Sequence, residues 1–536
     1  MRRVGRVLAL GAALLLPGCA PGPASGATPG GASGLVVVTA GGTALVDGQA
    51  DVPPTLDLRV IASHPLTPVA VGADLDGVPL SLVAAASGAV TASTAPMPLG
   101  SAHHLDLRVP GRPGQRLGFH VVAPAGAMAA LHTDPRDGTV LDLAVRLEPD
   151  HHAVEAALPP GAAVEWVDGR HLRATWRVAP GGALSLPAGL PVSRGSHLAA
   201  ALRLALDAVP LGQVRSVVVP APAAPLGSPA VLAFTVATAR SRASLAAHIG
   251  QVSLVSPTGV GVGSDGTLAG APDAPAVAVA RAHGVAVWPL LQNDASDSTG
   301  IAALLEDGAA RSRLVAAARR LASDGDYPGL QLDIEGVPEG ERDHLTGLVR
   351  ALAAGLHGDG RRLAVAVVPH KPGHLNVYSA AYDLPAIAGA ADLVTLMAYD
   401  QHTSLTDAGA VAGLGWDRQI LDGSLPELRA APKTLLGLPL YARRWGGDGV
   451  VADSYTASLA TAMAAPGARL DYDFDAATPY VHEGDGSSTT WFDDAASLAA
   501  KGALAGSLHL HGLALWRLGF EDPAVWSILP ATAAPI

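Results

Sequence analysis

The sequence predicts a multidomain fold in which an N-terminal all-β, sandwich-like region is followed by an α/β TIM barrel of eight strand–helix units. Three observations support this prediction. The 536 residues are enough for several domains of about 150 residues each. Residues 35–218 contain short runs in which apolar and polar residues alternate. Residues 230–536 instead alternate apolar runs with amphipathic stretches of helical period.

Residues 1–19 have the pattern of a bacterial export signal. Three arginines precede a short apolar run, and the sequence Leu16-Pro17-Gly18-Cys19 that ends it resembles a lipobox. The resemblance implies that Cys19, the one cysteine of the chain, is lipidated and anchors an exported protein to a membrane of the cell envelope. An ordinary secretory signal with an incidental cysteine is the alternative. Residues 20–34, rich in Pro, Gly, Ala and Ser, are expected to form a flexible tether.

The composition excludes several classes of function. Lys and Arg number 35 against 47 Asp and Glu, which gives a formal net charge of -12 at pH 7. An acidic chain binds polyanions poorly, so we expect no nucleic-acid partner and no membrane contact beyond the lipid anchor. The hydrophobic share of 49% excludes extensive disorder. We expect a monomer that needs neither a cofactor nor a metal ion.

Two sandwich-like domains are predicted, at residues 35–122 and 123–218. Apolar and polar residues alternate over residues 56–60, and turn-forming Gly, Pro and Asp separate such runs, as in β-sandwiches. We expect spacer or wall-binding modules. Residues 219–229, rich in Pro and Ala, form a linker that predicts independent folding of residues 230–536. Further strand-like runs are residues 141–147, 153–158 and 171–178.

The barrel strands are predicted where apolar runs recur. They are Val231–Val236, Val252–Ser256, Val285–Leu291, Gly329–Glu335, Leu363–Val368, Asp392–Tyr399, Thr434–Leu440 and Leu513–Leu518. Amphipathic stretches such as Ala309–Ala322 and Glu339–Leu356 fall between them and predict helices. A doubly wound open sheet is the alternative, but no glycine-rich phosphate loop follows the first strand. An insertion at about residues 442–493 separates the last two strands.

The fourth predicted strand carries carboxylates where a barrel core is normally apolar. Side chains alternate along a strand, so Gln331, Asp333 and Glu335 point into the barrel. Burying neighbouring carboxylates is costly, which indicates a function. Glu335 would lie at the C-terminal mouth, where barrel enzymes act, and the charge of Asp333 would raise the pKa of Glu335. The spacing therefore predicts that Glu335 is a general acid; a solvated strand end that caps the next helix is the alternative.

This fourth-strand segment resembles a motif of glycoside hydrolase family 18, the chitinase-like enzymes. The usual motif is Asp-Gly-x-Asp-x-Asp-x-Glu; this sequence keeps Asp333 and Glu335 but has Pro328 and Gln331 at the first two Asp positions. With these departures, the sequence resembles the branch of the family that includes spore-cortex-lytic, peptidoglycan N-acetylglucosaminidases. The resemblance covers about residues 230–536. Similar patches follow in the family's order at Pro289–Asn293, Pro369–Lys371, Met397–Asp400, Gly437–Tyr441 and Ala514–Gly519.

The resemblance implies retaining, substrate-assisted hydrolysis, in which the substrate's 2-acetamido group is the nucleophile. Glu335 would protonate the leaving oxygen, Asp333 would orient the acetamido N–H, and Tyr399 would donate to its carbonyl. Asp400 would hold Glu335 or a sugar hydroxyl, and Trp516 would be the floor under the sugar ring. The full set of expected substrate contacts is Gln331, Asp400, Tyr441, Arg443, Trp491 and Trp516.

These patterns predict an envelope-anchored glycosidase that cleaves β-1,4 bonds in a polymer containing N-acetylglucosamine, with peptidoglycan favoured over chitin-like glycans. Two alternatives accompany this prediction. A non-catalytic, lectin-like wall protein of family 18 would bind the glycan without cutting it. A metal-dependent polysaccharide deacetylase would use His370 and His374, although Pro372 and Gly373 oppose the helix that would bring them together.

Overall fold

The computed structural model describes residues 36–38, 44–61, 65–85, 88–109, 113–219, 226–227, 229–372, 375–447, 449–484, 486–532 and 534. The predicted signal peptide, Cys19, the tether and most of the linker at 219–229 lie outside the described residues, so these remain predictions. Within the described part of the chain, no helix is long and apolar enough to cross a bilayer.

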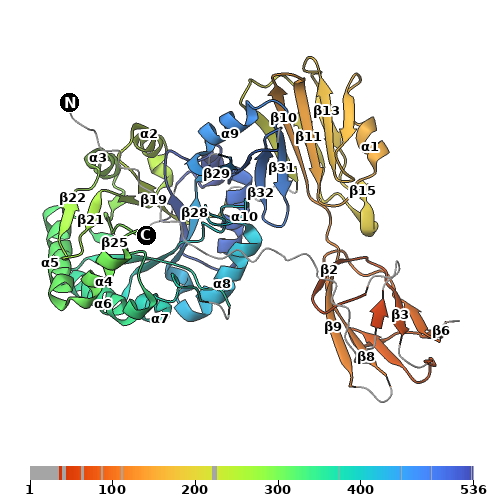
Figure 1. The fold of residues 1–536 in the computed structure, drawn as a ribbon, viewed down its shortest axis with the longest axis horizontal. Helices are drawn as coiled ribbons and strands as arrows, with labels where there is room; N and C mark the ends of the chain where they lie inside the picture. Colours follow the sequence, from red (N-terminus) through yellow and green to blue (C-terminus); the bar gives the residue numbers. More distant parts are fainter. Residues whose placement is uncertain are drawn as a thin grey trace.

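Eight parallel strands close into a barrel in the C-terminal half, as the sequence predicts (Figure 1). The barrel strands are β19 (Ala230–Thr235), β20 (Leu254–Pro257), the split strand β23 (Ala286–Val287) and β24 (Leu290–Gln292), β25 (Gly329–Asp333), β26 (Arg362–Val367), β27 (Leu393–Leu396), β28 (Thr434–Pro439) and β34 (Gly512–Trp516). β23 pairs with β20 and β24 pairs with β25, so the ring closes through the break between them. A hairpin of β21 (Val260–Val262) and β22 (Leu268–Gly270) continues the sheet beside β24.

Amphipathic helices cover the outside of this barrel. In α6 (Arg342–Gly358), residues at spacings of three and four are buried, among them Leu345, Leu348, Val349, Leu352 and Leu356. The other helical segments are α2 (Ala239–His248), η2 (Ile249–Gln251), α3 (Ala274–Ala282), α4 (Ser298–Glu306), α5 (Gly308–Asp324), η3 (Glu339–Glu341), α7 (Leu384–Ala390), α8 (Leu414–Leu428), η4 (Ala431–Lys433), α10 (Ala495–Ser507) and α11 (Val525–Ile528). One hydrophobic core fills the space between strands and helices, and a smaller cluster around Trp288 fills the barrel interior.

An inserted subdomain separates β28 from β34, at the position that the sequence predicts. Its elements are β29 (Tyr441–Gly446), β30 (Gly449–Ser454), α9 (Tyr455–Met463), β31 (Arg469–Asp473), β32 (Thr478–His482) and β33 (Thr489–Trp491). The strands form one antiparallel sheet in the order β30-β29-β33-β32-β31. Because β29 starts two residues after β28 ends, this sheet begins at the mouth of the barrel.

The N-terminal region consists mainly of antiparallel strands. Its first part holds β1 (Val36–Val38), β2 (Gln49–Val52), β3 (Asp57–Ile61), β4 (Gly72–Leu75), β5 (Val78–Pro79), β6 (Val83–Ala84), β7 (Val90–Ser93), β8 (Ala102–Arg108) and β9 (Gln115–Val121), in sheets of four and five strands. The second part holds β10 (Ala127–Asp134), β11 (Gly138–Val145), α1 (His151–Ala156), β12 (Ala163–Trp166), β13 (His171–Trp176), β14 (Ala183–Leu186), β15 (Pro191–Val192), η1 (Ser193–Gly195), β16 (Ser196–His197), β17 (Leu202–Ala205) and β18 (Val214–Val219). A hydrophobic cluster from Leu45 to Val219 joins the two parts.

The strand expected at residues 153–158 is wrong. This stretch belongs to α1, whose first turn is capped by the side chain of Asp150, which accepts a hydrogen bond from Ala153 N at 3.1 Å. A short apolar run is compatible with either structure, and the capping aspartate decides for the helix.

The second N-terminal part packs against the inserted subdomain, with β11 beside β31 (Figure 1). Met128, Ala130 and Ala144 share one buried cluster with residues such as Tyr472 and Phe492. The expectation that residues 230–536 fold independently is at odds with this packing, because removing the β region would expose the cluster to water.

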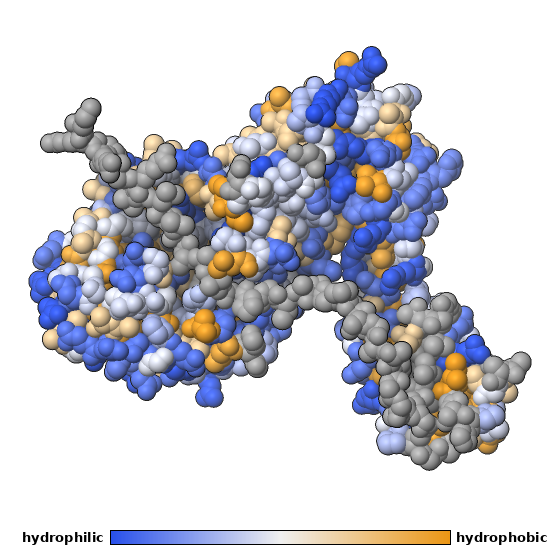
Figure 2. Space-filling model, in the orientation of Figure 1, coloured by the Kyte–Doolittle hydropathy of each residue, from blue (hydrophilic) through white to orange (hydrophobic). Residues whose placement is uncertain are grey.

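Polar contacts reinforce the same interface. Asp142 accepts a hydrogen bond from Leu470 N at 3.0 Å, and His171 lies 3.2 Å from Asp471. On the face shown in Figure 2, hydrophobic residues lie in separate small areas among hydrophilic ones.

Candidate active site

The end of β25 brings the two predicted carboxylates to the mouth of the barrel. Leu330 and Leu332 pack in the core beneath the helices, so the alternating residues Gln331 and Asp333 lie on the inner side of the strand. Asp333 is the last residue of β25 and is 9% exposed. Glu335 follows two residues later and keeps part of its surface open. Strand alternation therefore stacks the three polar side chains from the interior toward the opening.

The surroundings of this pair favour protonated carboxyls. The Oδ1 atom of Asp333 has no hydrogen-bond partner in the structure, and burial raises the pKa of Asp333 to about 7. Burial, and then the negative charges of Asp333 and Asp400, raise the pKa of Glu335 well above its ordinary value. Two carboxylates this close cannot both ionise easily, so the pair holds a proton near neutrality. A group that holds a proton there can act as a general acid.

Tyr399 stands beside the pair, three residues beyond the end of β27. Burial, and then the negative charges of Asp333, Glu335 and Asp400, raise the pKa of Tyr399 well above its ordinary value, so its hydroxyl stays a hydrogen-bond donor. Gly437 on the neighbouring strand makes room for the ring, since a Cβ there would lie 3.0 Å from Tyr399 Cε1 and 2.6 Å from a backbone oxygen. The backbone thus brings a neutral donor close to both carboxyls.

Asp400 is tied to the inserted subdomain. Arg443 Nη2 donates to Asp400 Oδ1 at 2.7 Å, and the hydroxyl of Tyr441 donates to the same oxygen. The second terminal nitrogen of Arg443 donates to the carbonyl of His402. A carboxylate that is 5% exposed needs a counter-charge, and Arg443 provides it. The expectation that Asp400 holds Glu335 or a sugar hydroxyl stays a prediction. Tyr441 and Arg443 both bind Asp400, and the sugar contacts expected of them stay predictions.

Two further residues fix the backbone of Glu335, and the sequence alone predicts a role for neither of them. Asn293 Oδ1 accepts from Glu335 N at 2.8 Å, while its Nδ2 donates to Glu335 O at 2.9 Å. The hydroxyl of Tyr382 donates to the carbonyl of Ile334 at 2.8 Å. Asn293 ends the patch Pro289–Asn293 that resembles the family, so this resemblance could have pointed to a role for it. No pattern in the sequence marks Tyr382.

Comparison with known families agrees with this geometry. Residues 279–521 match the model of the glycosyl hydrolases family 18. The matched residues make up less than half of the chain, so the match shows a similarity to this family. The match contains both carboxylates, Tyr399, Asp400 and the inserted subdomain, so the candidate site lies within the part of the chain that is similar to a glycosidase family.

Individual curated proteins are similar to this chain over less than half of its length. YdhD of Bacillus subtilis (strain 168), named as a sporulation-specific glycosylase, is 28% identical over 232 residues, 42% of this chain and 54% of its own length. The cortical fragment-lytic enzyme of the same organism is 27% identical over 249 residues, 45% of this chain and 57% of its own length. The chain thus spans little more than half the length of these curated relatives.

A solved structure is similar over the same part of the chain. The chitinase of Chromobacterium violaceum ATCC 12472 superposes with a TM-score of 0.52 and 27% identity, covering 56% of this chain and 98% of its own. This similarity agrees with the closed barrel described above.

The other predicted substrate contacts differ in how open they are to a ligand. Trp516 ends β34, is partly exposed and meets Phe234 edge-on at 5.1 Å between ring centroids. Its role as the floor under a sugar ring stays a prediction. Trp491 stacks on Tyr480 at 4.2 Å and is 9% exposed, so little of its ring is open to a sugar. Gln331 is wrong as a substrate contact, because its side chain has no exposed surface and its amide lies 3.5 Å from Thr395 Oγ1.

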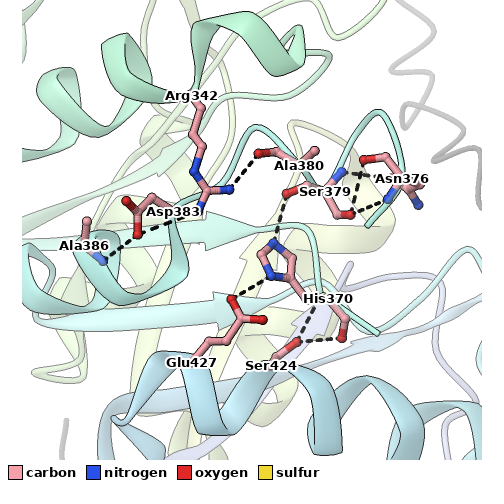
Figure 3. Close-up of polar contacts among 9 residues, drawn as sticks. All are labelled: Arg342, His370, Asn376, Ser379, Ala380, Asp383, Ala386, Ser424 and Glu427. Atoms are coloured by element: carbon pink, nitrogen blue, oxygen red, sulfur yellow. Dashed lines mark hydrogen bonds and ion pairs between the residues drawn. The ribbon is translucent and has the colours of Figure 1, made fainter. Parts of the chain in front are cut away.

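His370, which the deacetylase alternative needs as a metal ligand, is already bonded to other protein groups. His370 Nδ1 lies 2.9 Å from Glu427 Oε2 and His370 Nε2 lies 2.9 Å from the carbonyl of Ser379, so protein groups occupy both ring nitrogens (Figure 3). His374 lies outside the described residues. Among the residues that the structure describes, no three His, Cys, Asp or Glu side chains are grouped as metal ligands.

Proposed function

We propose that this chain is an exported glycosidase that hydrolyses β-1,4 bonds of a glycan containing N-acetylglucosamine, with retention of configuration. The observation that carries the proposal is the pair of the buried Asp333 and the partly exposed Glu335 at the barrel mouth, where the pKa of both carboxyls is raised. A general acid must hold its proton at working pH, and the neighbouring negative charge has this effect on Glu335.

The residues present suffice for substrate-assisted hydrolysis. Protonated Glu335 donates to the glycosidic oxygen while the acetamido carbonyl of the substrate attacks the anomeric carbon. Asp333 accepts the acetamido N–H, and the neutral hydroxyl of Tyr399 donates to the acetamido oxygen as charge develops there. Glu335, now a carboxylate, takes a proton from the water that opens the intermediate, and both groups return to their starting states. Two inversions at one carbon give net retention.

The proposed substrate is peptidoglycan, and the proposed location is the cell envelope. The name of one relative, the cortical fragment-lytic enzyme, supports a bacterial wall polymer. The lipobox-like sequence before Cys19 supports export and lipid anchoring, which would place the site near the wall. The chitinase similarity keeps chitin-like oligomers as substrates for comparison.

The decisive experiment compares the full chain with Glu335→Gln on soluble N-acetylglucosamine oligomers and on purified glycan strands. Gln is nearly isosteric with Glu and cannot donate a catalytic proton, so activity should fall by about 10²–10⁴-fold without loss of folding. The new reducing end should retain its configuration by NMR, and substrates with a free amine in place of the acetamide should stay intact. Inverted product would rule out the substrate-assisted mechanism. Binding of the oligomers without any hydrolysis would instead establish the lectin-like alternative.

A further inference from the structure

Tyr382 supports the end of the catalytic strand. Its ring is 2% exposed, and its hydroxyl donates to the carbonyl of Ile334, the residue before Glu335. Asn293 holds the N–H and the carbonyl of Glu335 itself. Burial, and then the charges of Glu335 and Asp333, raise the pKa of Tyr382 well above its ordinary value, so the hydroxyl remains a donor. The backbone under the general acid is therefore held from two sides.

The segment that carries Tyr382 lacks regular structure. Residues 375–383 are turns and irregular backbone, so side chains must fix them. Asn376 Oδ1 accepts from the backbone N–H of Tyr378 and of Ser379, at 2.9 and 2.8 Å. The carbonyl of Ser379 accepts from Tyr382 N at 3.1 Å. The position of Ser379 therefore fixes the position of the Tyr382 backbone.

His370 ties this turn to helix α8 (Figure 3). Its side chain is buried, with Nε2 at 2.9 Å from the carbonyl of Ser379 and Nδ1 at 2.9 Å from Glu427 Oε2. A carbonyl can only accept, so Nε2 carries the proton that it donates to Ser379. Ser424 Oγ accepts from His370 N at 2.9 Å and donates to His370 O at 3.2 Å. Both the ring and the backbone of His370 are thus fixed by α8.

Helix α8 packs closely against the loop that follows β26. A Cβ at Gly423 would lie 2.5 Å from the carbonyl of His370 and 2.8 Å from Pro372 N, so only glycine fits there. Arg342 closes the turn from the other side, since its Nη1 donates to the carbonyl of Ala380 at 2.8 Å (Figure 3). Packing this close transmits a displacement of α8 to the turn instead of absorbing it.

We propose that His370 and Glu427 are positioning residues for the general acid, acting through the Ser379 carbonyl and Tyr382 on the backbone of Glu335. The path runs Glu427, His370, Ser379, Tyr382, Ile334, and each step is a hydrogen bond; Ile334 is then joined covalently to Glu335. Neither His370 nor Glu427 contacts the reacting groups. The proposal rests on the proposed function and adds to it the residues that hold the acid in place.

The test is a double-mutant cycle on the full chain with soluble N-acetylglucosamine oligomers. His370→Ala and Tyr382→Phe should each lower kcat by about 10-fold to 100-fold, the range that misplacement of a catalytic group produces, with KM changed less than about twofold. The double variant should be no slower than the slower single variant, because both act on one path. Losses in kcat that multiply would overturn the proposal.

Two further variants separate positioning from folding. His370→Gln keeps a donor toward the Ser379 carbonyl and should recover most of the kcat lost in His370→Ala. His357→Ala breaks a similar pair, with Asp392 at 2.8 Å, at the opposite end of the barrel strands and should leave kcat unchanged. If kcat per folded molecule is equal in wild type, His370→Ala and His370→Gln, the pair has a structural role only and the proposal is wrong.

Hydrogen exchange decides the geometry without reference to activity. In His370→Ala, the peptide spanning residues 376–383 should exchange faster than in wild type, because the turn loses its tie to α8. Unchanged exchange would overturn the positioning path even if kcat fell. If exchange is faster in His370→Ala than in wild type but the wild type cuts no oligomer, the proposed function is contradicted. The hydrogen-bonded path from His370 to Tyr382 would still be supported.

Discussion

A general acid works only while it is protonated, and at Glu335 this depends on single neighbouring charges. Asp333 and Asp400 both raise the pKa of Glu335, but Asp400 is already neutralised by Arg443 at 2.7 Å. Asp333 has no such cation and lies on the same strand end. Asp333 is therefore the neighbour whose charge most directly controls the proton on Glu335.

Replacement of Asp333 should shift the pH dependence of hydrolysis. Activity falls as pH rises through the pKa of Glu335, because the acid then loses its proton. Asp333→Asn removes a charge that raises this pKa, so the basic limb of the kcat profile should move to lower pH. The remaining activity should also be lower, since Asn cannot polarise the acetamido group as a carboxylate does.

The matched control is Asp359→Asn. Asp359 pairs with Arg319 at 2.7 Å on the outer side of the barrel, so its replacement should leave the pH profile unchanged. A basic limb that stays in place in Asp333→Asn would mean that burial alone sets the pKa of Glu335.

Only part of this site could be predicted from the sequence. Asp333 and Glu335 stand out because a strand of alternating pattern places carboxylates where apolar residues belong. Tyr382 comes from an irregular turn, and its contact with Ile334 depends on the fold around it. Its sequence neighbourhood carries no periodicity, so neither its burial nor its partner has a local signal.

At the scale of the element, helix α8 combines an apolar face with a buried charge. Trp416, Ile420 and Leu421 pack inward at helical spacing, but Asp417 lies on the same face with 0% exposure and no hydrogen-bond partner for either carboxyl oxygen. Burial raises the pKa of Asp417 to about 8, although the ammonium of Lys501 nearby opposes this rise. The helix therefore contains a carboxyl whose ionisation would destabilise the fold.

Asp417→Asn should make the protein less sensitive to alkaline pH. Between pH 3.8 and about 8 the folded state retains a proton on Asp417 that the unfolded state releases, so the free energy of unfolding falls as pH rises in this window. The variant lacks this titration and should lose less stability between pH 5 and 8. Each tenfold difference in proton affinity between the folded and unfolded states corresponds to about 1.4 kcal/mol.

Denaturant unfolding at several pH values measures this difference. Asp422→Asn, on the exposed side of the same helix, is the control and should follow the wild type. If Asp417→Asn and wild type lose stability in parallel as pH rises, Asp417 is ionised in the folded protein.

Elements differ in how far the sequence alone predicts them. The barrel strands are apolar runs bounded by turns and helices, and each lies within a few residues of its expected place. The run at residues 153–158 has the composition of a strand, but its first four residues belong to α1, whose first turn is capped by Asp150. For such short runs, tertiary context outweighs local pattern.

At the scale of the whole molecule, the second β region and the inserted subdomain share a core. Met128, with 1% exposure, lies in a buried cluster with Leu459 and Phe492, which come from the subdomain that begins at the barrel mouth. Linker composition suggests separable domains, but composition carries no information about which faces meet across it. This interface therefore could not be predicted from the sequence.

Met128→Asp should destabilise the β region and the inserted subdomain together. An unpaired charge in this cluster should lower the free energy of unfolding by several kcal/mol, as for other uncompensated buried charges. Calorimetry should show a lower transition temperature, and proteolysis should open the inserted subdomain as well as the β region.

Val178→Asp provides the matched control, because Val178 lies in the same region with 78% exposure and the new charge stays in water. Its transition should coincide with that of the wild type. If Met128→Asp leaves the inserted subdomain as protease-resistant as before, the two parts are energetically independent.

The proposed lipid anchor leads to a further prediction for the molecule as a whole. Cys19→Ala should prevent lipidation, so the mature protein should leave the membrane fraction or remain an uncleaved precursor. Fractionation and labelling with a radioactive fatty acid measure this outcome. A variant that partitions and is processed like the wild type would show that the Leu16–Cys19 sequence is not a lipobox.

The shared core also has a consequence for biosynthesis. Ala144 leaves the ribosome about 300 residues before Tyr472, and at roughly 5–20 residues per second the delay amounts to tens of seconds. Throughout that time the nascent β region displays an apolar face whose natural cover has not yet been translated. Such a face is open to association with other chains, so the yield of correctly assembled protein should depend on chaperones that shield it until elongation is complete.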